Sequence, residues 1–86
     1  MQKIEIPQED MVSVREMTNR IKGVLSRHIK DRRVNDSDVA DILRIKQGTF
    51  GAMKAKNKMP VDQVVDFCSR AGLYVEPILC KVVKTS

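Results

Sequence analysis

The sequence contains few of the residues that disulfide scaffolds, metal sites and large cores require. Aromatic side chains make up 3% of the 86 residues, tryptophan is absent, and there are 2 cysteines and 1 histidine. Cys68 and Cys80 stand apart, with no C-x-x-C pair and no second potential ligand beside them. We therefore expect reduced thiols in a cytoplasmic protein, and no metal site.

Membrane segments, secretory signals and catalytic patterns are also missing. No apolar run is long enough to span a membrane, and the N-terminal residues do not have the pattern of a secretory signal. His28 is the single histidine, and there is no nucleophile–base pair and no phosphate-binding glycine loop. We therefore do not expect an enzyme, a cofactor, a small-molecule ligand or a membrane partner.

The length and composition suit one small helical domain. A chain of 86 residues is enough for one domain but not for two. Hydrophobic residues account for 42% and charged residues for 31%, and the sequence has little of the aromatic and β-branched alternation that strands favour. We expect an all-α fold, a compact bundle of four to five short helices around one core.

Positive charge is concentrated in two segments. Residues Arg15–Arg33 hold seven basic and two acidic side chains, and residues Lys46–Lys58 hold four lysines and no acid. The segments between and after them are acidic, although the net charge is +5. Such blocks favour a polyanionic partner on one side of the molecule, but solvated helix faces explain them equally well.

The hydrophobic spacing predicts four helices and room for a fifth short turn. The first begins near Glu9 or Asp10 and runs to about Lys30, and the second spans Asp38 to about Arg44 with Ser37 as its N-cap. A third follows after a few residues, with Phe50 and Met53 on its buried side. The fourth begins around Pro60 and is followed by Gly72 as its C′ residue, and Glu76–Leu79 could start a fifth short turn.

Residues Asp36–Asn57 have the pattern of a helix-turn-helix. Ala40 is the small residue that lets the second helix of such a motif cross closely over the first. The apolar residues that would fix the crossing angle are Val39, Leu43, Ile45, Phe50 and Met53. The exposed start of the second helix would carry Lys46, Gln47, Gly48, Thr49, Gly51 and Ala52.

From about Arg20 to Leu79 the order of these features resembles the N-terminal DNA-binding domain of phage CI-type repressors, which has the lambda-repressor-like fold. The matching features are Ala40, Leu43, Gln47-Gly48-Thr49, Phe50, Lys54–Lys58, Pro60, Phe67-Cys68, Gly72-Leu73 and Leu79. The resemblance implies a transcriptional regulator, most simply a repressor, that binds an operator in the nucleoid of a bacterial host as a homodimer. From the pattern of the chain itself we expect an N-terminal arm at residues 1–10, a helix-turn-helix domain at 11–80 and a C-terminal tail at 81–86.

Two features depart from the family pattern. Arg44 stands where the family usually has a glycine with positive φ, and a non-glycine residue there costs on the order of 1 kcal/mol. Asp36, Asp38 and Asp41 surround the start of the second helix, which in the family normally abuts a DNA phosphate. Carboxylates stabilise a helix N-terminus but repel phosphate.

Side-chain chemistry suggests how the candidate residues would contact double-stranded DNA. Gln47 can bond adenine in the major groove, Lys46 can reach guanine or a phosphate, and Thr49 and Ala52 can contact a thymine methyl. Gly48 and Gly51 would let the helix backbone approach the bases. The candidate phosphate contacts are Arg32, Arg33, Lys54, Lys56 and Lys58.

One alternative comes from a different functional class. A protein-interaction module could keep the helix-turn-helix and lose specific DNA binding, and Arg44 and the three aspartates favour that hypothesis. Salt-sensitive DNA binding would separate the two, because phosphate contacts depend on salt and apolar protein contacts do not.

Overall fold

Five α-helices and one 3₁₀ turn form residues 6–81, the part of the chain that the computed structural model describes. In chain order they are η1 Gln8–Asp10, α1 Val14–Leu25, α2 Asp36–Ile42, α3 Gln47–Lys56, α4 Val61–Ala71 and α5 Glu76–Leu79. Within these residues the only extended pairing is an isolated antiparallel bridge between Met11 and Cys80. The prediction of a compact all-α bundle of four to five short helices is confirmed.

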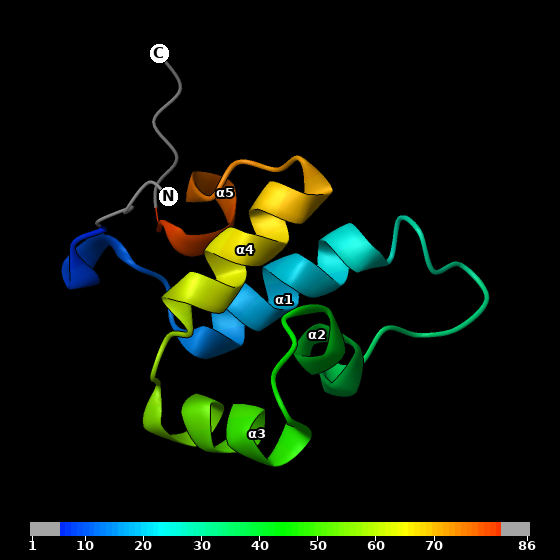
Figure 1. Cartoon of the computed structure of the whole chain (residues 1–86), viewed down its shortest axis with the longest axis horizontal. Coiled ribbons are helices and arrows are strands. Elements are labelled where there is room, and N and C mark those ends of the chain that lie inside the picture. Colours follow the sequence, from blue (N-terminus) through cyan, green and yellow to red (C-terminus); the bar gives the residue numbers. More distant parts are fainter. Residues whose placement is uncertain (1–5, 82–86) are drawn as a thin grey trace.

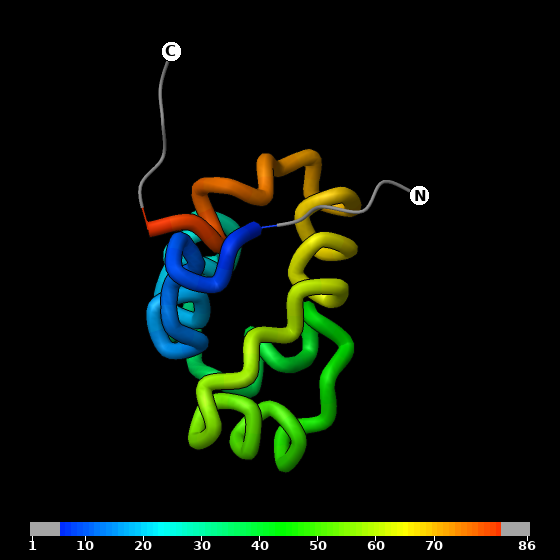
Figure 2. The backbone as a smooth tube through the Cα atoms, turned by 90° about the vertical axis from the view of Figure 1, so that its left-hand side faces the viewer, coloured from blue at the N-terminus to red at the C-terminus, as the bar shows by residue number. Residues whose placement is uncertain are grey.

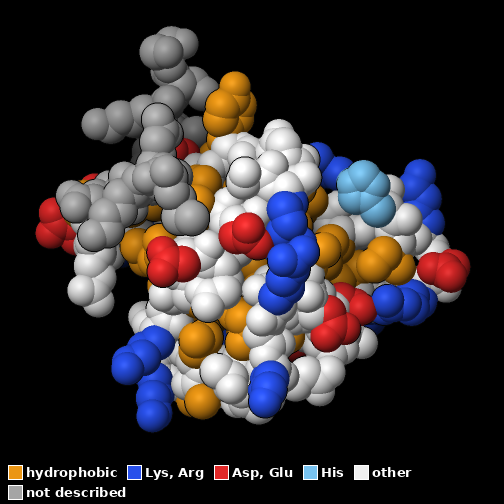
Figure 3. Space-filling model, in the orientation of Figure 1, with side chains coloured by type: hydrophobic (Ala, Val, Ile, Leu, Met, Phe, Trp, Pro, Cys, Tyr) orange, Lys and Arg blue, Asp and Glu red, His pale blue; other side chains and the backbone are white. Residues whose placement is uncertain are grey.

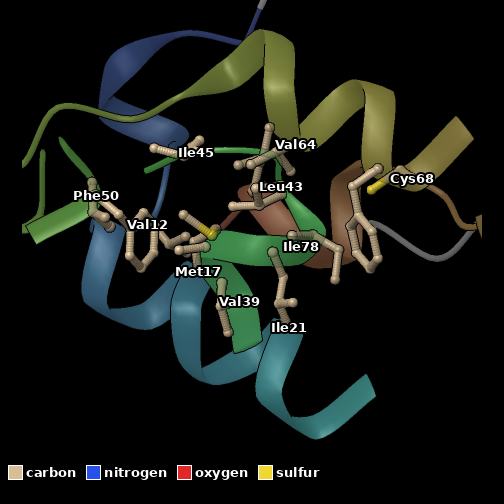
Figure 4. Packing of buried hydrophobic residues seen from close by; sticks show 14 residues of the cluster. Val12, Met17, Ile21, Val39, Leu43, Ile45, Phe50, Val64, Cys68 and Ile78 are labelled. Carbon is tan, nitrogen blue, oxygen red and sulfur yellow. The ribbon is translucent and has the colours of Figure 1, made fainter. Parts of the chain in front are cut away.

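The helices surround one core, with α1 at its centre. α1 contacts α2, α3 and α5, and α2 also contacts α3 (Figure 1). Side chains from all five helices meet there, and Phe50 of α3 points toward Val12 while Val64 of α4 lies over Leu43 (Figure 4). No helix in the described part of the chain is long and apolar enough to cross a membrane.

The two ends of the described chain are joined to each other. The Val12 N–H donates to the Leu79 carbonyl at 2.8 Å, and the Lys81 N–H donates to the Asp10 carbonyl at 2.8 Å. Asp10, the last residue of the predicted arm, is thus bonded to the C-terminal end of the domain. Residues 1–5 of that arm and residues 82–86 of the predicted tail lie outside the described residues. α3 lies at the end of the molecule opposite these joined ends (Figures 1 and 2).

The first helix is shorter than the sequence predicted. α1 begins at Val14 because the Ser13 hydroxyl accepts the Glu16 N–H at 3.1 Å and so caps it. Residues near Glu9 form the separate 3₁₀ turn instead. The helix ends at Leu25, and exposed His28 lies in the turn that follows rather than on the helix face.

The N-cap predicted for the second helix is also wrong. Asn35, not Ser37, caps α2, because its side chain accepts the Asp38 N–H while the Asp38 carboxylate accepts the Asn35 N–H at 2.9 Å. This reciprocal pair satisfies two backbone donors, which a cap at Ser37 would not do. The helix therefore begins two residues earlier than predicted.

Three successive helices end in the same way. After α2, α3 and α4 the chain takes a left-handed residue, at Arg44 (φ 61), Asn57 (φ 54) and Gly72 (φ 69) respectively. In α2 the Ile45 N–H returns to the Ala40 carbonyl at 2.9 Å, and the Arg44 N–H returns to Asp41 at 3.0 Å. These bonds satisfy the last carbonyls of the helix and turn the chain sharply toward α3.

Candidate functional site

One face of α3 lies against the core and the opposite face is exposed. Phe50, 2% exposed, holds the inner face, and half-buried Met53 packs against the same core. The outer face carries small residues at the spacing of a single helical stripe, and all of them are exposed. They are Gly48, Gly51, Ala52 and Ala55.

The two glycines of this stripe are not required by the fold. A Cβ built at Gly48 or Gly51 meets no atom within 4 Å, and neither residue has a positive φ. Each glycine in a helix costs about 1 kcal/mol relative to alanine. The packing of the chain on itself therefore does not explain them, whereas a partner that approaches the α3 backbone closely would.

The six residues that the sequence proposed for base contacts lie together at the start of α3. Lys46 is the N-cap residue of the helix, Gln47 is its first residue, and Thr49 lies in its first turn. All six are exposed, and they are Lys46, Gln47, Gly48, Thr49, Gly51 and Ala52. They form one continuous surface with the small-residue stripe.

An open hollow adjoins this surface between α3 and the start of α2. It is lined by Arg15, Asp36, Ser37, Ala40, Gln47, Phe50, Gly51, Lys54 and Ala55. Arg15 belongs to α1, the start of which is bonded to the end of α3. The Val14 N–H donates to Asn57 Oδ1 at 2.9 Å, which joins the first residue of α1 to the end of α3.

The charge in the hollow is balanced by Asp36. Its two carboxylate oxygens pair with Lys22 of α1 and Lys54 of α3, so that one residue of α2 joins three helices. Bonding from Lys22 first and Lys54 second holds the pKa of Asp36 below its ordinary value, although partial burial opposes the shift. Lys54, a predicted phosphate contact, is therefore already paired with an acid.

A second predicted phosphate contact is also paired. Arg32 donates two hydrogen bonds to Asp38, both at 2.8 Å, from the loop before α2. The Arg32 guanidinium, together with the Asn35 N–H, lowers the pKa of Asp38 to about 2. The carboxylate is thus ionised throughout the range in which proteins are usually studied.

The remaining predicted phosphate contacts are exposed. Arg33, Lys56 and Lys58 form no ion pair with any residue in the described range 6–81. The part of the surface over α3 shows basic side chains and no acidic ones, whereas both kinds are mixed over the centre of the same view (Figure 3). The structure thus separates the predicted set into two cations that are paired with an acid and three that have no ion pair within residues 6–81.

Two functional candidates were not identified from the sequence. Arg15 lines the hollow where the start of α1 meets the end of α3, and Asn57 bonds Val14, 43 residues away in sequence, at that point. Asp36 appeared as one of three acids near a helix start, but its partners come from α1 and α3. No local spacing indicates such contacts, since they depend on how three helices pack.

Comparison of the chain with models of known families, with curated proteins and with solved structures found no match. Inferences about function therefore rest on the residues of this chain. The features that carry them are the exposed small-residue face of α3, the polar residues at its start and the charged hollow beside it.

Proposed function

We propose that this protein binds double-stranded DNA sequence-specifically, as a transcriptional regulator of the phage-repressor type. In this proposal α2, the turn at Arg44 and α3 act as a helix-turn-helix, and α3 enters the major groove. The observation that carries it is the exposed face of α3, where Gly48 and Gly51 serve no packing purpose. A helix with such a face can bring its backbone close to base edges.

The turn supports the proposal. The sequence has arginine where the related family uses glycine, yet Arg44 takes the left-handed conformation that the turn needs, with φ 61. Ala40 is fully buried and Leu43 is 1% exposed, so the small and apolar residues expected between two crossing helices lie there. The departure at Arg44 therefore does not count against a helix-turn-helix.

The proposed contacts follow from the exposed chemistry. Gln47 has the amide that pairs with adenine N6 and N7, and Lys46 can reach guanine O6 and N7. Arg33, Lys56 and Lys58 provide cations for phosphate, and Arg15 joins them from the hollow. One such helix contacts only a few base pairs, so we expect a homodimer on two half-sites.

Selection of bound duplexes from a random pool, followed by fluorescence anisotropy, tests the proposal. The wild-type protein should prefer the selected site over an unrelated duplex of equal length. Gln47→Ala should reduce that preference by roughly 5- to 160-fold, since a bidentate base contact is worth about 1–3 kcal/mol of discrimination. Lys56→Ala, the matched control, should weaken binding to both duplexes by the same factor. An unchanged preference with Gln47→Ala would assign the base contacts to other residues.

A second candidate function is a protein-interaction module that lacks specific DNA binding. Asp36 and Asp38 favour it, because they pair with Lys54 and Arg32, two of the five cations that the sequence analysis assigned to phosphate. It predicts that no duplex binds with an affinity that depends on salt. In the first proposal, each phosphate contact adds about 0.9 to the slope with which the logarithm of the binding constant falls against the logarithm of the salt concentration.

A further inference from the structure

Asp36 lies where α1, α2 and α3 come together. It lines the hollow beside the α3 face, and it pairs with Lys54, which lines the same hollow. Its other oxygen pairs with Lys22, so a single carboxylate contacts two ammonium groups. Arg15 also lines the hollow, and it has no ion pair among residues 6–81. The positive charge that the hollow presents therefore depends on Asp36.

Stability alone gives little reason for this arrangement. The side chains of Asp36, Lys22 and Lys54 are 43%, 31% and 24% exposed, and ion pairs with that degree of solvent contact stabilise proteins weakly. The carboxylate has a larger effect on an approaching polyanion, because it repels phosphate and engages the lysine that would bind it. A paired lysine releases fewer counterions than a free one when DNA binds.

We propose that Asp36 is a specificity-determining residue that suppresses phosphate binding in the hollow and so weakens the binding of unrelated DNA. This inference rests on the proposed function. Non-specific binding depends almost entirely on phosphate contacts, whereas the preferred site is also held by base contacts from α3. At the preferred site the base contacts fix the register of the protein, so Lys54 gains a phosphate only if one already lies within its reach, whereas on unrelated DNA the protein can shift until one does. An acid that engages Lys54 therefore lowers affinity for unrelated DNA more than affinity for the preferred site.

Asp36→Asn tests the proposal by removing the charge and keeping the size of the side chain. Asp41→Asn is the matched control, since Asp41 lies in the same helix, is exposed and has no ion pair within residues 6–81. Both variants gain one net positive charge. Anisotropy titrations would use the selected duplex and an unrelated duplex at several salt concentrations.

The two variants should behave differently. Asp36→Asn should tighten binding to the unrelated duplex about eightfold near 0.1 M salt and steepen the salt slope by about 0.9, the effect of one added phosphate contact. The selected duplex should gain less, so the preference for it falls. Asp41→Asn should change each affinity less than about twofold, because its charge lies away from the hollow and is screened. Equal effects of the two variants, or an unchanged preference, would overturn the proposal.

A double variant distinguishes two causes of tighter binding: the release of Lys54 from Asp36, and a change in folding. Lys54→Gln should weaken binding to the unrelated duplex about eightfold in the Asp36→Asn background, because Lys54 is then free for phosphate, and much less in the wild type. Equal losses in the two backgrounds would contradict the proposal. Asp36→Ser repeats the test if Asp36→Asn melts at a lower temperature, since serine also suits a helix start. If the wild type has no sequence preference, the proposed function itself fails.

Discussion

Arg44 occupies a backbone conformation that arginine seldom adopts. Its φ of 61 lies in the left-handed region, which costs L-residues roughly 1–2 kcal/mol relative to the right-handed one. The same position after α3 and α4 holds Asn57 and Gly72, the two residue types that tolerate it best. Arg44 remains left-handed because its N–H and that of Ile45 bond the last carbonyls of α2.

Arg44→Gly should therefore stabilise the protein. Glycine removes the steric cost of the positive φ but adds about 0.5–1 kcal/mol of chain entropy to be lost on folding, so we expect a net gain of up to about 1.5 kcal/mol. Urea unfolding followed by circular dichroism measures it. Arg15→Gly, in the right-handed backbone of α1, is the control and should lose roughly 1 kcal/mol. A loss of stability with Arg44→Gly would show that its side chain matters more than its backbone.

Single residues in the sequence predicted the turn after α2 correctly but its N-cap wrongly. The resemblance placed a left-handed residue at Arg44, and the turn contains one there. Ser37 has a hydroxyl of the kind that caps helices, but Asn35 and Asp38 together satisfy two backbone donors and a lone hydroxyl satisfies one. The capping-box spacing was present in the sequence, and its reciprocal bonds decided where α2 begins.

At the scale of elements, α3 has an open outer face and is a less stable helix because of it. Phe50 is its one buried side chain, and glycines occupy two positions of its outer stripe. α3 would be a more stable helix if longer side chains replaced the two glycines on this exposed face. The position of α3 followed from the hydrophobic spacing of Phe50 and Met53, whereas the absence of contacts at its glycines needed coordinates.

Gly51→Gln should raise stability and reduce DNA binding. Glutamine favours a helix over glycine by roughly 0.5–1 kcal/mol, and the space beyond Gly51 is empty in the protein itself. If α3 enters the major groove, the added side chain should lower affinity for the selected duplex at least tenfold. Gly23→Gln in α1 is the matched control, because its surroundings are equally open. It should melt at a similarly raised temperature and bind DNA as the wild type does; equal DNA binding by both variants would remove α3 from the interface.

The start of α2 should make stability depend on pH in acid. The Arg32 guanidinium and the Asn35 N–H lower the pKa of Asp38 to about 2 in the folded protein, from an ordinary value of 3.8. A carboxylate whose pKa is lower in the folded state stabilises that state above the ordinary value, and its contribution disappears as pH falls from about 4 to 2. Urea midpoints of the wild type should therefore approach those of Asp38→Asn over that interval. A difference in urea midpoint between the two proteins that stays constant down to pH 2 would contradict this account. Asp41→Asn is the control for loss of an acid from the same helix.

At the scale of the whole molecule, the charge blocks of the sequence are only partly visible as surface charge. Arg20 bonds the carbonyls of Pro77 and Cys80, and Arg70 bonds the carbonyl of Ile42, so these cations hold helices together. Lys54 and Arg32 pair with acids. The sequence could show where basic residues are concentrated, but the packing of the helices decides which of them face a partner.

The shape of the molecule limits how two copies could bind one DNA. The described residues extend 36 × 29 × 24 Å, close to the 34–36 Å between half-sites one helical turn apart. The loop between α4 and α5, which carries the 85% exposed Tyr74, lies at the end opposite α3 (Figures 1 and 2). Two copies joined through that loop would point their α3 helices in opposite directions. A dimer on adjacent half-sites must therefore use another face.

We accordingly expect selected duplexes to contain two half-sites in inverted order, about 10–10.5 base pairs apart from centre to centre. Inserting five base pairs between them should abolish cooperative binding, because the second α3 would face the opposite side of the duplex, whereas inserting ten should restore the alignment. Tyr74→Ser should leave the spacing and the cooperativity unchanged, since that loop faces away from the neighbouring copy. Loss of cooperativity with Tyr74→Ser, measured by the steepness of anisotropy titrations, would place the dimer contact at the α4–α5 loop and rule out this arrangement on DNA.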